Sequence, residues 1–293
     1  MALDGTVISC MAWELNHALA GGKINKIAQP EKDELMLTIK NNRKQYRLLV
    51  SASASLPLVY LTDQNKTGPM TAPNFCMLLR KHIGSGRILR IWQPGMERIL
   101  NMEIEHLNEL GDICRKLLII ELMGKHSNII FCQEDGMILD SIKHVSAQVS
   151  SVREVLPGRM YFIPETQHKY DPQTITEEEF FSSVCQKPMP LSKAIYTTLT
   201  GISPLIAEEI CYRASIDGND AAQSLDENAS VHLYHTFKRL IEQVQEGNFS
   251  PNIIYHGEEP VEYAVVPLTQ YGPDYHSETF ESVSEMLETY YAS

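Results

Sequence analysis

The amino-acid sequence predicts an α+β protein made of two consecutive domains, residues 1–170 and 171–293. Short apolar runs with strand-like alternation recur through the first segment. Helix-start signals and helical spacing of apolar residues replace them in the second. The charge changes at the same place: residues 1–170 carry 20 Lys+Arg and 17 Asp+Glu, whereas residues 171–293 carry 5 and 20.

The first domain is predicted to contain two sheets covered by a few helices, because many short strands at regular spacing favour that architecture. Strand-like runs lie at residues 24–27, 35–39, 46–50, 87–92, 98–104, 116–122 and 128–132. Asn41 and Asn42 supply turn residues between the second and third runs. A short helix is expected at 74–82, between Pro73 and Gly84.

The second domain is predicted to be a helix-hairpin-helix-like helical domain that ends in a β-hairpin. Thr174 or Thr176, followed by three glutamates, is a helix N-terminal signal. Further helices are expected at 191–200, from the turn at 201–204 through Arg213, and at 231–245 with Gly247 as the stop. Tail strands are expected at 252–255 and 262–268.

No segment of the sequence resembles a secretory leader or a membrane span. The first 27 residues lack an uninterrupted apolar stretch, and apolar runs such as residues 117–120 are far below the ~20 residues that a span needs. The six cysteines stand singly, which favours buried reduced thiols over disulfides or a zinc site. A cytoplasmic protein without a metal, a cofactor or a membrane partner is therefore expected.

The net charge of −12 argues at first against a nucleic-acid partner, because such proteins usually carry a basic surface. The net charge is the sum of +3 for the first domain and −15 for the second. Between residues 66 and 98, six basic side chains are opposed only by Glu97: Lys66, Arg80, Lys81, Arg87, Arg90 and Arg98. The first domain is therefore the part expected to face phosphate.

Three stretches carry the candidate contacts. Arg80 and Lys81 project from the predicted helix at 74–82, although a charge pair is also typical of any solvated helix face. Arg98 follows Glu97 at a strand start, where a structural arginine is the commoner case. The third stretch runs from Glu121 to Asn128 and offers Glu121, Met123, Lys125, His126, Ser127 and Asn128.

The adjacent His126 and Ser127 do not make a convincing hydrolase site. Neighbours in sequence are not a catalytic triad, and no orienting acid is evident. This stretch offers a cation, an imidazole, a hydroxyl and an amide. Such a set suits contact with the phosphates and sugars of a nucleic-acid backbone better than it suits catalysis. The predicted helix pair around Gly201 has the form of an anion-binding helical hairpin, but Glu208 and Glu209 would repel a phosphate, so a packing role is equally open.

Together these stretches resemble the amino-terminal region of the NFACT family. The resemblance lies in Leu3-Asp4-Gly5, Gly21 to Pro30, Pro73 to His82, Gln93 to Ile99, Glu121 to Ile130, Asp140 to His144, and Arg153 with Val155 to Gly158. It runs the length of the chain, and its motifs are long.

The resemblance implies a function in ribosome-associated quality control. Family members bind large ribosomal subunits that carry an obstructed nascent chain, and they recruit tRNA (alanyl-tRNA in bacteria) to add a carboxy-terminal tail. The amino-terminal domain is their non-enzymatic, tRNA-facing part. The family's Asp-Arg pair matches Glu97 and Arg98, one methylene longer at the acid, and its early Asp matches Asp4. The expected tRNA-binding residues are Asp4, Arg80, Lys81, Glu97, Arg98, Glu121, Met123, Lys125, His126, Ser127 and Asn128.

The resemblance also implies a fold related to formamidopyrimidine-type DNA glycosylases. Those enzymes begin with a nucleophilic proline and a glutamate, whereas this chain begins Met1-Ala2-Leu3-Asp4. No glycosylase activity and no small-molecule substrate are expected. Family members continue into a coiled coil and a further domain, while this chain shows no sustained heptads. A fibronectin-binding surface adhesin is the alternative from another class, and the missing leader and unpaired cysteines argue against it.

Overall fold

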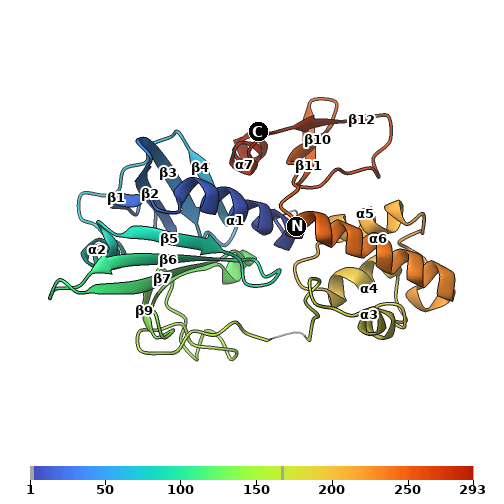
Figure 1. Cartoon of the computed structure of the whole chain (residues 1–293), viewed down its shortest axis with the longest axis horizontal. Helices are drawn as coiled ribbons and strands as arrows, with labels where there is room; N and C mark the ends of the chain where they lie inside the picture. Colours follow the sequence, from blue (N-terminus) through green and yellow to red (C-terminus); the bar gives the residue numbers. More distant parts are fainter. Residues whose placement is uncertain (1–2, 166–167, 293) are drawn as a thin grey trace. The chain divides into compact units, whose positions relative to one another are not determined.

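The computed structural model describes residues 3–165 and 168–292, which divide into two compact units (Figure 1). The sheet unit comprises residues 11–94 and 98–165, and the helical unit comprises residues 3–10, 95–97 and 168–292. The two units therefore do not correspond to two consecutive segments of the sequence, such as 1–170 and 171–293. The first residues belong with the helical unit because the Gly5 amide donates to the Gly201 carbonyl at 2.8 Å.

The sheet unit contains one antiparallel sheet of nine strands in the order β4-β3-β2-β1-β5-β6-β7-β8-β9. The pairing between β1 and β5 is the shortest in this sheet, because only Lys23 and Arg87 are paired there. The strands are β1 (Lys23–Ala28), β2 (Glu34–Asn41), β3 (Lys44–Ser51), β4 (Leu58–Thr62), β5 (Arg87–Trp92), β6 (Ile99–Leu107), β7 (Ile113–Glu121), β8 (Asn128–Gln133) and β9 (Ile138–Ser141).

The α+β class is confirmed, but the placement of its sheets differs from the expectation. Two sheets were expected in the first domain, whereas its strands join into one. The second sheet has three strands and lies in the helical unit: β10 (Asn252–His256), β11 (Glu259–Ala264) and β12 (Tyr275–Thr279), in the order β11-β10-β12. Alternation along a strand identifies which side chains are buried, but it does not identify the neighbouring strand.

The first helix, α1 (Gly5–Leu19), was not expected from the sequence. Its buried side chains Val7, Met11, Leu15 and Leu19 recur every four residues, which is a helical signal that strand-like residues such as Val7 and Ile8 obscure. The expected short helix is α2 (Asn74–Ile83), which packs against β1 and β6.

The helical unit carries the remaining helices, and its end signals match the sequence. Thr176 forms a capping box with Glu179. Gly247, with φ of 75°, follows the helix that was expected at 231–245. That helix begins earlier than expected, because Asp226 accepts a hydrogen bond from the Ala229 amide at 2.7 Å. The helices are α3 (Glu177–Ser183), α4 (Leu191–Thr198), α5 (Pro204–Arg213), α6 (Glu227–Gln245) and α7 (Val283–Ala292).

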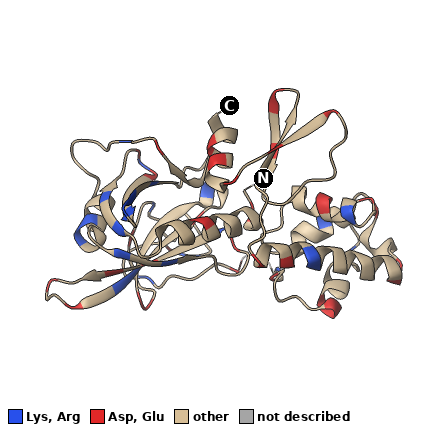
Figure 2. Ribbon diagram, turned by 45° about the horizontal axis from the view of Figure 1, so that its top comes forward, with Lys and Arg blue, Asp and Glu red and all other residues tan. Residues whose placement is uncertain are grey.

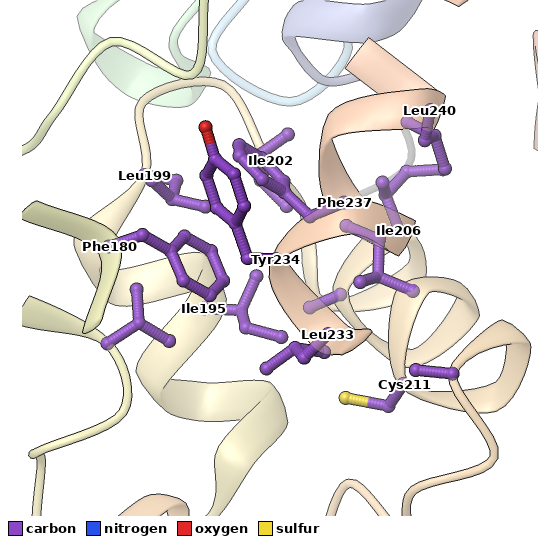
Figure 3. Packing of buried hydrophobic residues seen from close by; sticks show 14 of the residues in the cluster. Phe180, Ile195, Leu199, Ile202, Ile206, Cys211, Leu233, Tyr234, Phe237 and Leu240 are labelled. Carbon is purple, nitrogen blue, oxygen red and sulfur yellow. The ribbon is translucent and has the colours of Figure 1, made fainter. Parts of the chain in front are cut away.

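The core of the helical unit is built around an aromatic cluster, which Figure 3 shows with its aliphatic neighbours. The Phe180 ring stacks on Phe237 at 5.1 Å between centroids and meets Tyr234 edge-on at 5.4 Å. Leu233 and Ile206 pack in the same cluster. Since these side chains come from α3, α5 and α6, burial of the cluster stabilises the arrangement of the helices.

Candidate nucleic-acid interface

The two units differ strongly in charge (Figure 2). The sheet unit carries 19 Lys+Arg and 15 Asp+Glu, a net charge of +4, whereas the helical unit carries 6 and 22, a net charge of −16. A polyanion is attracted to the first and repelled by the second at distances comparable to the Debye length.

The segment from Glu121 to Asn128 forms a rigid turn between β7 and β8, with a 3-10 helix at Gly124–His126. The Ser127 hydroxyl donates to the Gly124 carbonyl at 2.7 Å and accepts from the Met123 amide at 2.9 Å. Asn128 donates its amide to the Lys143 carbonyl at 3.0 Å. Ser127 and Asn128 are buried, whereas Lys125 and His126 are exposed. Ser127 and Asn128 therefore hold the turn in place, and the turn exposes Lys125 and His126.

Glu121 lies in the interior of the sheet unit. Its side chain is fully buried, forms an ion pair with Arg153 and accepts a hydrogen bond from the Tyr161 hydroxyl at 2.8 Å. Burial, and after it the Glu121 charge, raises the pKa of Tyr161, which therefore remains a hydroxyl donor. Met123 packs against a small apolar cluster that includes Ile99 and Ile119. In this geometry Glu121 anchors the loop that carries Arg153.

Arg98 lies at the same end of the sheet as Lys125 and His126. Its backbone carbonyl accepts from the Leu122 amide at 2.9 Å, and the next residue, Ile99, pairs with Glu121. Arg98, Lys125 and His126 are called the sheet-end cluster below. Glu97 belongs to the helical unit, so the division between the units falls between the two residues of the predicted pair.

Asp4 is buried in the helical unit. One carboxylate oxygen accepts from the Thr6 amide at 2.9 Å and the Val7 amide at 3.2 Å, at the start of α1. The other accepts from the Ser203 amide at 3.3 Å, in the turn between α4 and α5. Burial raises the pKa of this carboxyl above its usual value. The position of Asp4 is that of a helix cap which also holds a second turn.

Glu209, which the sequence left open between repelling an anion and packing, is fully buried in α5. Its carboxylate pairs with Arg213 at 2.7 Å and accepts from the Thr269 amide at 2.8 Å. The helical hairpin therefore uses this glutamate for packing.

Arg80 and Lys81 lie far from the sheet-end cluster. They occupy the last turn of α2, where the Arg80 Nε donates to the Ile27 carbonyl at 2.8 Å. They line a groove with Leu107, the last residue of β6, whereas Arg98 precedes the first residue of β6. Nine residues of extended strand span about 30 Å. The basic residues of the expected tRNA-binding set thus fall into two separate groups, whereas Lys66 pairs with Glu34 at 3.1 Å and Arg90 with Glu103 at 3.5 Å.

The sequence reasoning missed the residues that surround Arg80 and Lys81. Lys26 on β1 and His82 on α2 line the same groove together with His106 on β6. Lys26 lies in a stretch already singled out by the resemblance, but only the packing of α2 against both β1 and β6 brings it into one groove with His106. Among residues 3–165 and 168–292, no helix is long and apolar enough to cross a bilayer, and no cluster of His, Cys, Asp and Glu could hold a metal ion.

The comparison with known families matches almost the whole chain. The family model described as NFACT N-terminal and middle domains covers residues 4–293. The protein named Rqc2 homolog RqcH of Bacillus subtilis is 36% identical over 293 residues, which are 99% of this chain and 49% of that protein. The protein of the same name from Streptococcus suis is 30% identical over 99% of this chain and 48% of its own length. This chain spans about half the length of these relatives.

Solved structures give the same picture of the fold. The amino-terminal part of the fibronectin/fibrinogen-binding protein of Streptococcus suis matches 99% of this chain with a TM-score of 0.80 and 30% identity, over 98% of its own chain. The fibrinogen-binding protein of Staphylococcus aureus matches over the full length of both chains with a TM-score of 0.83 and 28% identity. A glycosylase of the formamidopyrimidine type from Thermus thermophilus reaches a TM-score of only 0.41 at 14% identity over 83% of this chain and 76% of its own.

Proposed function

Because this chain belongs to the NFACT family, we propose that it is the tRNA-binding amino-terminal module of a ribosome-associated quality-control factor. The whole factor is proposed to bind large ribosomal subunits with an obstructed nascent chain and to recruit tRNA, alanyl-tRNA in a bacterium, for carboxy-terminal tailing. In this proposal the module acts in the cytoplasm by binding alone, without catalysis or a cofactor.

The observation that carries the proposal is the sheet-end cluster on a unit of net positive charge. Arg98 has a planar fork of donors that suits a phosphate or a base edge, and the exposed Lys125 and His126 add polar side chains at the same end of the sheet. The buried Ser127 and Asn128 support them by holding the turn, which lowers the entropy cost of binding.

The acidic residues of the predicted set take different parts in the proposal. Glu97, which precedes Arg98, is proposed to accept from exocyclic amino groups or to orient the arginine. Asp4 and Glu121 are proposed to act indirectly, by holding the chain segments around them in place, since their carboxylates are buried and hydrogen-bonded. RNA is expected on the surface of the sheet unit, because the helical unit carries a charge of −16.

Replacing Arg98 by alanine is expected to weaken tRNA binding by about 1–3 kcal/mol, because alanine cannot make the bidentate hydrogen bond of the guanidinium. Filter binding at one fixed salt concentration measures the change. Arg43→Asn is the matched control: it also removes one positive charge from the sheet unit, and asparagine tolerates the φ of 68° found in the turn between β2 and β3. An Arg98→Ala affinity equal to that of the unaltered chain would remove Arg98 from the interface.

A fibronectin-binding surface adhesin is the second candidate, and the name of the similar solved structure from Streptococcus suis, a fibronectin/fibrinogen-binding protein, favours it. Surface biotinylation of intact cells distinguishes the two functions, because an adhesin is labelled and a factor acting on ribosomes is not. An enzyme acting on nucleic acid is the third. Product from a strand-nicking assay on DNA with an oxidised base would overturn the non-enzymatic proposal.

A further inference from the structure

A groove of about 510 Å³ lies at the carboxyl end of α2, within the sheet unit. It is bounded by β1, by the last turn of α2 with the loop that follows, and by the end of β6. The residues that line this α2 groove include Lys26, Arg80, Lys81, His82 and His106.

The α2 groove is basic throughout. Lys26, Arg80 and Lys81 contribute three permanent positive charges, and no Asp or Glu is among the described residues that line it. A fourth cation, the Lys116 ammonium, does not line the groove but lies 3.1 Å from the Nε2 of His106, which does. Glu109 approaches Lys81 at 4.0 Å, but both side chains are largely exposed, and such surface pairs contribute about 1 kcal/mol at most. The groove therefore favours an anion.

Two donors of the groove, Arg80 and His82, are held in place by the fold. The bond from Arg80 Nε to the Ile27 carbonyl uses one of the five N–H groups of the guanidinium and fixes the plane of the rest. The His82 ring packs against the His106 ring edge-on and against Phe131, with centroids 6.0 and 5.8 Å apart. Fixed donors of this kind suit phosphate oxygens, which accept several hydrogen bonds at once.

The two imidazoles add a response to pH. Burial, followed by the charge of Lys116, lowers the pKa of His82, and burial is also the largest cause of the lowered pKa of His106. Both rings are therefore neutral at pH 7. The charged and titratable groups near them are Lys81 on α2, Lys116 and Cys114 on β7, and Glu109 after β6. A phosphate in the groove would favour the protonated form of each ring.

We propose that the α2 groove binds backbone phosphates of an RNA, as a second contact about 30 Å along β6 from the sheet-end cluster. The inference rests on the proposed tRNA binding and adds a contact that carries no sequence information. An extended polyanion fits better than a free phosphate ion, because the groove is open and its cations come from β1 and from two positions on α2.

The double variant Lys26→Ala/Lys81→Ala tests the proposal in the 293-residue chain. Both side chains are exposed, so the fold should tolerate their removal. The affinity for tRNA is expected to fall about tenfold near 0.15 M salt. The negative slope of log K against log salt should become shallower by about 2, roughly 1 for each phosphate that a lysine no longer neutralises. Lys40→Ala/Arg43→Asn is the charge-matched control, since neither residue lines the groove, and it should change the affinity less than about twofold.

The outcomes separate this inference from the proposed function. A double variant that binds like its control, while Arg98→Ala weakens binding, overturns the groove alone. Oligouridylate bound as tightly as tRNA, with the groove variant still weakened, keeps the groove and overturns tRNA recognition. No binding of either RNA by the unaltered chain overturns both.

Cys114 does not line the groove but is next to His106, which does, so its alkylation supplies an independent readout. Its Sγ lies 3.3 Å from the His106 Nε2, and it is only half-buried, whereas the other five cysteines are buried. Iodoacetamide therefore reports mainly on Cys114. Saturating tRNA is expected to slow its alkylation severalfold, and an unchanged rate would contradict occupancy of the groove.

Affinity for tRNA is expected to rise as the pH falls from 7.5 to 5.5, because binding draws protons onto His82 and His106, whose pKa values are lowered in the free protein. The variant His82→Gln/His106→Gln should lose this part of the pH dependence. Equal pH profiles for the variant and the unaltered chain would show that the two rings take no part.

Discussion

Replacing Glu121 by alanine is expected to lower the free energy of unfolding of the sheet unit by about 3–5 kcal/mol. The substitution removes the partner of a buried arginine, since Arg153 is about one tenth exposed and Glu121 is not exposed at all. It also leaves the Tyr161 hydroxyl without its acceptor. A buried charge without a counter-charge keeps its desolvation cost and loses the attraction that offset it.

Urea titration followed by tryptophan fluorescence measures this loss, because both tryptophans, Trp13 and Trp92, belong to the sheet unit. Glu134→Ala is the matched control: it removes an exposed glutamate of the same unit and should cost less than about 0.5 kcal/mol. Adding Arg153→Ala to Glu121→Ala should cost less than the sum of the two single changes. A stable Glu121→Ala variant with weakened tRNA binding would instead identify Glu121 as a direct contact.

Replacing Gly201 by alanine is expected to destabilise the helical unit by about 3 kcal/mol or more. The residue has φ of 78°, where side chains other than glycine are strained, and a Cβ would stand 2.1 Å from the Met96 carbonyl oxygen. The Gly5 Cα would lie 3.1 Å from the same Cβ. Because both obstacles are backbone atoms, the turn between α4 and α5 would have to move.

Far-UV circular dichroism at 222 nm during thermal unfolding measures this change, because α3 to α7 all belong to the helical unit. Gly257→Ala is the matched control. Its φ of 65° carries similar strain, but no atom lies within 4 Å of the added Cβ, so its cost should be about 1–2 kcal/mol. Equal losses in the two variants would show that backbone strain alone, and not the close approach to Met96, determines the effect.

Helix ends and buried strands were predictable because their signals are local. A hydroxyl followed three residues later by a glutamate predicts a capping box, and Thr176 with Glu179 forms one. The start of α6 was placed too late, because Asp226 is a cap whose helix continues through polar residues before the apolar ones begin. The helix α1 was missed because β-branched residues at its start match both a strand and a helix.

The candidate site was predictable only as a set of residue types. Sequence placed Ser127 and Asn128 beside Lys125 and His126 as equal contacts, whereas the structure buries the first pair and exposes the second. Which side chain of a turn faces inward depends on the neighbouring strands, here through the bonds of Asn128 with Lys143. The roles of these residues in binding tRNA stay predictions.

The sequence by itself determined the α+β class, the family, the capping box of α3, the end of α6 and the location of the positive charge, because propensity, periodicity and composition are properties of short segments. Only the tertiary structure decided that Asp4 and Glu121 lie in the interior, and that Arg80 and Arg98 lie at opposite ends of β6. It also brought Lys26, His82 and His106 into one groove. Those outcomes depend on which strands pair, and strand pairing joins residues distant in sequence that no local pattern connects.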